Sequence, residues 1–154
     1  MIREQIMQTI EADLGAIRLG NSVELDSGTY IFKSDAGHTV SLRRTTPLPE
    51  HFTRAVDIRD PRCERDRERA EFGTRRHLLS VEINIVAQGE AAAVTVRKIL
   101  SDVVAVIAAN RRWSGLADWT DTEAVETEQA QGAKPEAYAT LTLTVRYRAP
   151  HWEA

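Results

Sequence analysis

Cysteine and histidine are the residues best suited to chemistry in this 154-residue chain, but their spacing matches no common catalytic or metal-binding motif. The one cysteine, Cys63, cannot form an internal disulfide, and as a nucleophile it would need a base, for which His77 is the candidate. His38, His51 and His151 form no H-x-x-x-H pair and do not approach Cys63 at a metal-ligand spacing. The pattern favours an incidental thiol and structural or solvent-exposed histidines over a nucleophile or a zinc site.

Two carboxylates, Asp57 and Asp60, lie close enough in sequence to act as an acid and base pair. A turn in which Asp60 precedes Pro61 explains the same residues equally well. The sequence contains no G-x-S-x-G nucleophile elbow, no G-x-x-x-x-G-K-[ST] phosphate loop and no G-x-G-x-x-G dinucleotide fingerprint. We therefore expect no cofactor, no metal and no enzymatic activity, and a small enzyme with an unrecognised site remains a less favoured alternative.

The most polar stretch of the chain runs from Arg59 to Arg76. Its seven arginines, at 59, 62, 65, 67, 69, 75 and 76, alternate with five acids, at 60, 64, 66, 68 and 71. The arginines suggest phosphate binding, but the interleaved acids cancel much of the local field, and the net charge of the chain is −3. We predict a mobile charged loop at about 59–76 between two strands, either solvated or at a protein interface, with a short charged helix as the alternative. Specific nucleic-acid binding is not expected.

A strand followed by a long helix is the feature around which the rest of the chain must pack. Residues 79–87 alternate apolar and polar side chains, which predicts a strand with one buried face. Over 90–110 the apolar residues recur at three- and four-residue steps, which predicts an amphipathic helix. Residues 137–148 alternate again, and their polar face is rich in threonine, which favours a solvated or subunit-facing sheet surface.

The remaining segments complete the predicted fold. Ile2, Ile6, Ile10 and Leu14 are four residues apart and predict a second helix that ends near Gly15. Short strands are predicted near 23–25, 29–32 and 52–58, modest strand character at 121–131, and mainly loop at 34–50. Together these elements predict a single domain, 1–154, of the α+β class: a largely antiparallel β-sheet with two main α-helices packed on one face. With no membrane-length apolar run and no secretory signal, we expect a protein made in the cytosol that does not act on membranes.

Four consecutive segments resemble a known family. They are the strand LLSVEINIVAQG, the helix AAAVTVRKILSDVVAVIAAN, the segment WSGLADWTDTEAVETE and the closing strand AYATLTLTVRYRAP. This order, from Leu78 to Pro150, resembles the tail terminator or minor tail proteins of long-tailed phages and prophages. The most specific parts of the resemblance are the turn Gly115, Leu116, Ala117 after the helix and the closing strand that ends at Tyr147.

The resemblance implies a structural function. Members of this family form a six-membered ring on the head-proximal end of the tail tube, where the ring stops tube growth and provides the surface for the head. The implied partners are other copies of the chain, as a homo-hexameric ring or as a monomer when free, the tail tube protein and a head-completion or connector protein. The implied location is the virion tail, and the host cytoplasm during assembly.

A ring needs two different contact patches on each subunit, because its contacts are head-to-tail. From the charged loop and the polar face of the last strand, we expect a subunit or tail interface at Arg62, Arg65, Arg67, Arg69, Glu64, Glu68, Thr140, Thr142, Thr144 and Arg146. Another head–tail joining or tail completion protein is the alternative within the same class. A nucleic-acid-binding module would need a one-sided basic face, which the net charge disfavours.

Overall fold

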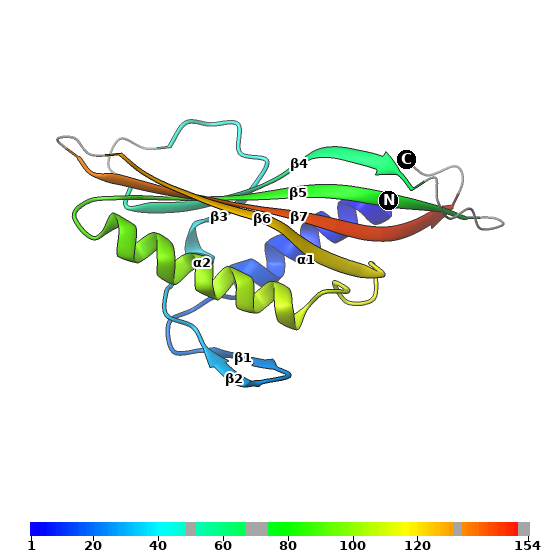
Figure 1. The fold of residues 1–154 in the computed structure, drawn as a ribbon, viewed down its shortest axis with the longest axis horizontal. Helices are drawn as coiled ribbons and strands as arrows, with labels where there is room; N and C mark the ends of the chain where they lie inside the picture. The colour runs from blue at the N-terminus through cyan, green and yellow to red at the C-terminus, as the bar shows by residue number, and fades with distance from the viewer. Residues whose placement is uncertain (49–51, 67–73, 131–133, 151–154) are drawn as a thin grey trace.

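A helical layer and a sheet layer make up the computed structural model, which describes residues 1–48, 52–66, 74–130 and 134–150. The elements in chain order are α1 (Ile2–Gly15), β1 (Ser22–Leu25), β2 (Gly28–Ile31), the 3₁₀ helix η1 (Ala36–Thr39), β3 (Val40–Leu42), β4 (Arg54–Arg65), β5 (Thr74–Gln88), α2 (Ala92–Ala109), β6 (Trp119–Ala130) and β7 (Glu136–Pro150) (Figure 1). The predicted α+β class is confirmed.

The main sheet has the strand order β3-β4-β5-β7-β6 in the described part of the chain, and β1 and β2 pair separately as a small hairpin. The pairs β4–β5, β5–β7 and β6–β7 are antiparallel, and the short β3 runs parallel to β4. The predicted strands 79–87 and 137–147 are direct neighbours, with Ile83 opposite Leu141, and the predicted helix packs against both as α2. These three placements confirm the central part of the sequence prediction.

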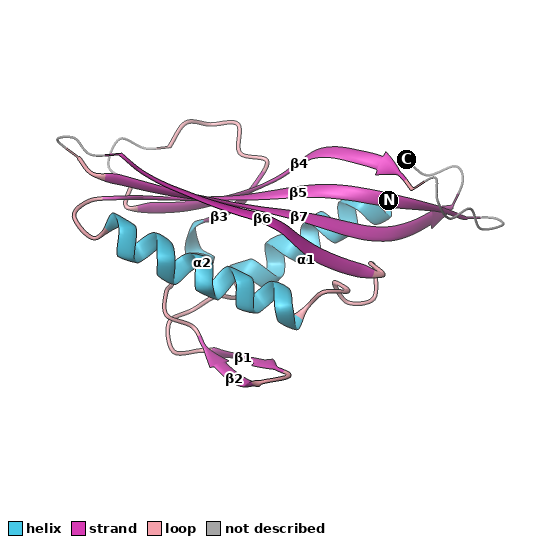
Figure 2. Cartoon of the chain, in the orientation of Figure 1, coloured by secondary structure: helices cyan, strands magenta, loops and turns pink. Residues whose placement is uncertain are grey.

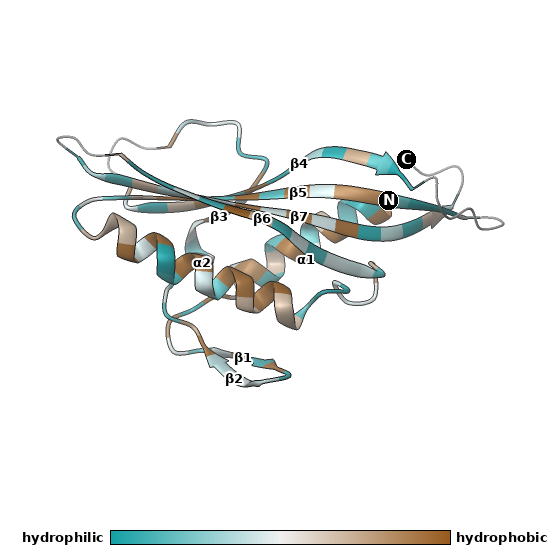
Figure 3. Ribbon diagram, viewed as in Figure 1, coloured by the Kyte–Doolittle hydropathy of each residue, from teal (hydrophilic) through white to brown (hydrophobic). Residues whose placement is uncertain are grey.

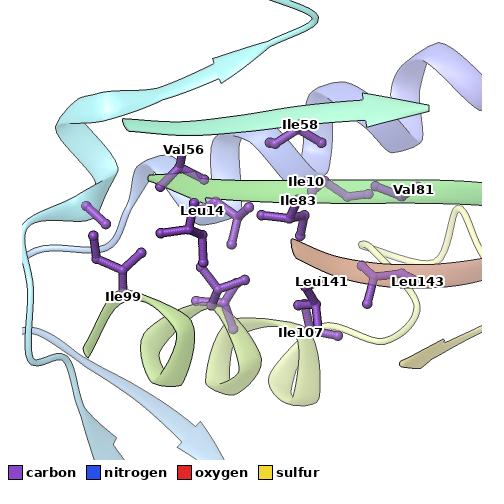
Figure 4. Packing of buried hydrophobic residues seen from close by; sticks show 14 of the residues in the cluster. Ile10, Leu14, Val56, Ile58, Val81, Ile83, Ile99, Ile107, Leu141 and Leu143 are labelled. Carbon is purple, nitrogen blue, oxygen red and sulfur yellow. The ribbon is translucent and has the colours of Figure 1, made fainter. Parts of the chain in front are cut away.

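One hydrophobic core joins the two layers. The odd-numbered residues of β5 from Leu79 to Ala87 are buried, while the even-numbered residues between them keep partial contact with solvent. Ile99 and Val103 of α2 and Ile10 of α1 belong to the same cluster. Figure 4 shows Ile10, Ile83, Ile99 and Leu141 in the space between the helices and the strands. Figure 2 draws both helices on the same side of the sheet.

The described residues of the predicted charged loop are mainly strand. β4 continues to Arg65 and β5 starts at Thr74, so the loop prediction is wrong for 59–65 and for 74–76, and residues 67–73 lie outside the described residues. A β-bulge between Arg59 and Arg62 explains the missed pattern, because it shifts the alternation of side chains by one residue. The core-facing residues Ile58 and Cys63 are therefore an odd number of positions apart, and the apolar period of two breaks there.

One further strand differs from the sequence prediction, whereas the strand character predicted at 121–131 is confirmed by β6. β3 lies inside the stretch predicted as loop, and its three residues are too few to show a period. β6 begins at Trp119, and every residue from Thr122 to Ala130 is exposed, so the strand lacks the apolar face that a sequence pattern would reveal. Its partner β7 holds it in the sheet along nearly the whole strand.

A buried carboxylate ties the β1–β2 hairpin to α2. Asp102 is fully buried and accepts hydrogen bonds from the Tyr30 hydroxyl at 2.8 Å, the Lys33 amide at 3.0 Å and the Ser34 hydroxyl at 2.5 Å. The Ser101 and Tyr30 hydroxyls are 2.7 Å apart, which extends the network. Burial, together with the Asp102 carboxylate, raises the pKa of Tyr30 and keeps its hydroxyl protonated as a donor. This network fixes the chain that leaves the hairpin against the helix.

Candidate interaction surface

The sheet face away from the core is polar and ordered in rows across four strands. One row places Arg62 of β4, Ser80 of β5, Thr144 of β7 and Asp121 of β6 side by side. The row beyond the bulge places Asp57, Asn84, Thr140 and Glu126 together in the same strand order. Within this row the Thr140 hydroxyl donates to the Asn84 side-chain oxygen at 3.0 Å. The threonine face predicted from the sequence therefore forms the middle of this surface.

The edge of the sheet formed by β6 is acidic. Its sequence WTDTEAVETEQA contains Asp121, Glu123, Glu126 and Glu128 and no lysine or arginine. On the side away from β7 it has no strand partner among the described residues. Figure 3 colours most of this strand as hydrophilic, although Val125 is 46% exposed. We call this strand the acidic edge.

The opposite edge of the sheet is rich in arginine. β4 has four arginines, at 54, 59, 62 and 65, against three acids, at 57, 60 and 64, and Arg43 and Arg44 follow β3. β3 pairs only with Val56–Ile58, so the part of β4 beyond Ile58 has no strand partner on this side among the described residues. Arg62 and Glu64 form a solvent-exposed ion pair at 3.3 Å, which contributes little to stability. We call the segment Arg59–Arg65, with Arg43 and Arg44, the basic edge.

An ion-pair cluster anchors the basic edge to the helical layer. The Asp60 carboxylate, whose side chain is 6% exposed, accepts hydrogen bonds from Arg3 Nε at 2.9 Å and from Arg43 Nε and Nη2 at 2.7 and 2.8 Å. Arg43 also reaches Glu4 at 3.0 Å. Burial alone would raise the pKa of Asp60, but the Arg43 and Arg3 guanidinium groups outweigh it and hold that pKa below its usual value. The cluster joins α1, the turn after β3 and β4.

This cluster gives a pH-dependent stability. Because the pKa of Asp60 is lower in the folded state, its carboxylate stabilises the fold fully above its unfolded pKa of about 3.9, and this contribution is lost as the pH falls further. We expect Asp60→Asn to lower the free energy of unfolding by about 2 kcal/mol at pH 7 and by less at low pH. Urea unfolding at pH 7 and pH 3 measures both values, with the exposed Asp26→Asn as control. An equal loss at both pH values would contradict the role of the charge.

A cavity of about 460 Å³ opens on the polar face near the start of β4. Its apolar lining includes Leu48, Phe52, Val86 and Tyr138. Asp57 and Glu136 are the carboxylates that line it, and Asp57 already accepts hydrogen bonds from the Arg59 side chain at 2.7 Å and the Arg44 amide at 3.0 Å. Asp57 and Asp60 are thus bound by different arginines, and the structure gives no support to a shared acid and base site.

Cys63 and His77 meet at one aromatic residue. The Cys63 sulfur lies 3.4 Å from the Tyr147 hydroxyl, and the His77 imidazole stacks on the Tyr147 ring with 5.0 Å between ring centres. In the described residues, no group of three or more histidine, cysteine, aspartate or glutamate side chains is arranged to hold a metal ion. The cluster packs β4, β5 and β7 together at one end of the sheet.

The two tryptophans after α2 have different environments. Trp113 is fully buried, and its indole nitrogen donates to the Thr120 hydroxyl at 2.8 Å. Trp119 is 43% exposed at the start of the acidic edge, with the Arg111 guanidinium 5.3 Å from its ring centre. Trp113 is thus a core residue, whereas Trp119 adds apolar area to the acidic edge.

The described residues of the predicted interface lie on two different parts of the sheet. Arg62, Glu64 and Arg65 lie on the basic edge, while Thr140, Thr142, Thr144 and Arg146 lie on the polar face of β7. Arg67, Glu68 and Arg69 lie outside the described residues. The sequence prediction omitted the acids of β6, and the signal that could have identified them is a run of four acids without a single base.

The comparisons with known proteins give this surface no precedent: no protein-family model matches the chain, and no curated protein matches it either. Among the described residues, no helix combines the length and apolar character needed to cross a membrane.

Proposed function

We propose that this protein is a phage tail terminator: it forms a ring, most simply a hexamer, that caps the head-proximal end of the tail tube. The ring stops tube polymerisation and provides the surface to which the head joins. The protein acts by surface complementarity, without a chemical step or a cofactor. Its partners are further copies of itself, the tail tube protein and a head-completion or connector protein, and it works in the virion tail after assembly in the host cytoplasm.

The observation that supports this proposal most is the family-like order of segments from Leu78 to Pro150. These segments correspond to β5, α2, β6 and β7, which lie next to one another: α2 packs on β5 and β7, and β6 pairs with β7. The resemblance therefore covers one packed unit of the fold. Two unlike sheet edges and a broad polar face are also the kind of surface that a ring subunit needs, since head-to-tail contacts join different patches.

The physical task is to end a self-propagating stack. A tube grows because each ring offers the next one the same face, so a terminating ring must match the tube on one face and differ from it on the other. A ring that closes on a tube end, which acts as its template, agrees with a free chain that is monomeric at low concentration.

Deletion of the gene from the phage or prophage that carries it tests the proposal. We expect electron microscopy to show overlong tail tubes without attached heads, because nothing then ends tube growth or joins the head. Expression of the wild-type gene from a plasmid should restore normal particles. Tails of normal length that join heads normally would refute the terminator function. Tails of normal length without heads would favour the alternative, a head–tail joining or completion protein.

A further inference from the structure

We propose that the acidic edge, β6, binds the basic edge, Arg59–Arg65 with Arg43 and Arg44, of a second copy of this chain. The contact extends the sheet from one subunit to the next, in a head-to-tail manner. This inference rests on the proposed function, because it specifies how the ring subunits meet.

Strand direction makes the two edges compatible. β6 is antiparallel to β7, β7 is antiparallel to β5, and β5 is antiparallel to β4, so β6 and β4 run in opposite directions within one subunit. A second copy displaced sideways in the plane of the sheet therefore places its β4 antiparallel to the first copy's β6. Antiparallel pairing is the more stable arrangement of backbone hydrogen bonds.

The charges select this pairing over its alternatives. Two acidic edges would bring four acids of one copy against four of the other, which disfavours a symmetric contact through β6. The basic edge offers Arg62 and Arg65, both exposed, to the acids of the neighbouring copy. Like-charge repulsion in the wrong arrangement and attraction in the right one set the orientation of the subunits.

β6 also exposes the surface that a neighbouring strand would cover. All its residues from Thr122 to Ala130 are exposed, and its twelve residues make it a long edge strand. On β4, Pro61 lacks an amide hydrogen and sits in the bulge between Arg59 and Arg62. We therefore assign the backbone pairing to the segment from Arg62 to Arg65. Arg44 adds charge beside it, whereas Arg43 and Arg59 are already paired with Asp60 and Asp57 within the subunit.

Charge reversal on each edge tests the contact with purified chain alone. The first variant is Glu123→Lys with Glu126→Lys on the acidic edge, and the second is Arg62→Glu with Arg65→Glu on the basic edge. Sedimentation measures association up to about 1 mM at low salt, the concentration at which a contact of millimolar affinity is half formed. The control is Arg97→Glu with Lys98→Glu, two exposed cations on α2.

We expect the wild type and the control to associate, and each edge variant to associate at least about tenfold more weakly. An equal mixture of the two edge variants should recover association, because each reversed edge then meets a complementary one. A chain with both edges reversed should associate with itself as the wild type does.

Three results would overturn the inference: a wild type that stays monomeric at about 1 mM, an edge variant that associates like the wild type, or a mixture that associates no better than its components. Binding of β6 to an extended basic segment of another protein, with no self-association, would likewise overturn it. The test is independent of tail length. If the mixed edge variants associate but the deletion strain has normal tails, the terminator function is refuted and the head-to-tail contact is still supported.

Discussion

Val103→Asp is expected to unfold the domain or make it insoluble. Val103 is completely buried in the middle of α2 and belongs to the cluster that joins both helices to the sheet. An aspartate there must lose its hydration without gaining a partner, which destabilises the fold by about 4 kcal/mol or more. Because a domain of this size has about 5–15 kcal/mol of stability in total, a loss of this size leaves little folded protein at the lower end of that range. Circular dichroism with urea unfolding measures the effect.

The next residue provides a matched control for this substitution. Val104 is also a helical valine, but its side chain is 41% exposed, so Val104→Asp places the same charge in water. The two variants share the change in helix propensity and differ in burial. We expect Val104→Asp to change the free energy of unfolding by about 0.5 kcal/mol or less. A soluble and fully folded Val103→Asp protein, as stable as the Val104→Asp control, would contradict the packing of α2 on the sheet.

The strands and the helix with a buried face were predictable from the sequence. Leu79 to Ala87 and Ala137 to Tyr147 alternate because one side of β5 and β7 contacts the core, and α2 repeats at helical steps for the same reason. In each of these elements one face is buried, so apolar residues recur at regular steps in the sequence. β5 and β7 pair because each has one apolar face, and the pairing buries both faces in the same core.

The edges of the sheet were not predictable to the same degree, and the cause is physical. β6 has both faces exposed beyond Asp121, and β4 has a bulge that resets its alternation, so neither strand leaves a continuous apolar period. The charged residues of β4 were predicted as loop because a polar run without apolar residues to bury is usually disordered. That expectation does not hold where a neighbouring strand supplies backbone hydrogen bonds. Here β5 provides a backbone partner for Arg62 to Arg65.

The same limitation affects the candidate site. The sequence placed three threonines correctly on the polar face, because alternate residues of β7 point to opposite faces of the sheet. They are Thr140, Thr142 and Thr144. The opposition of an acidic and a basic edge could not be seen, because it depends on the strand order that separates β6 from β4. Charge runs in a sequence therefore become an interface hypothesis only after the topology is known.

The buried Asp102 network was also hidden from the sequence, since its partners are about 70 residues away. Asp102 lies beside Val103 on an otherwise apolar side of α2, and its role becomes visible only when Tyr30 and Ser34 are seen to donate to it. A buried carboxylate of this kind is tolerated because hydrogen bonds replace its lost hydration. Its hydrogen bonds connect the segment that follows the hairpin to α2.

Asp102→Ala is accordingly expected to lower the free energy of unfolding by about 3 kcal/mol, because it leaves the Tyr30 and Ser34 hydroxyls and the Lys33 amide without their acceptor. Ser101→Ala is the matched control: it removes one partner of Tyr30 from the same turn of α2, leaves the carboxylate in place, and should cost about 1 kcal/mol. Thermal and urea unfolding measure both changes. A double-mutant cycle with Tyr30→Phe then separates the network from simple packing, because two residues that share a hydrogen bond give non-additive losses. Strictly additive losses, or an Asp102→Ala protein as stable as Ser101→Ala, would show that the hairpin is held by its apolar contacts and not by this carboxylate.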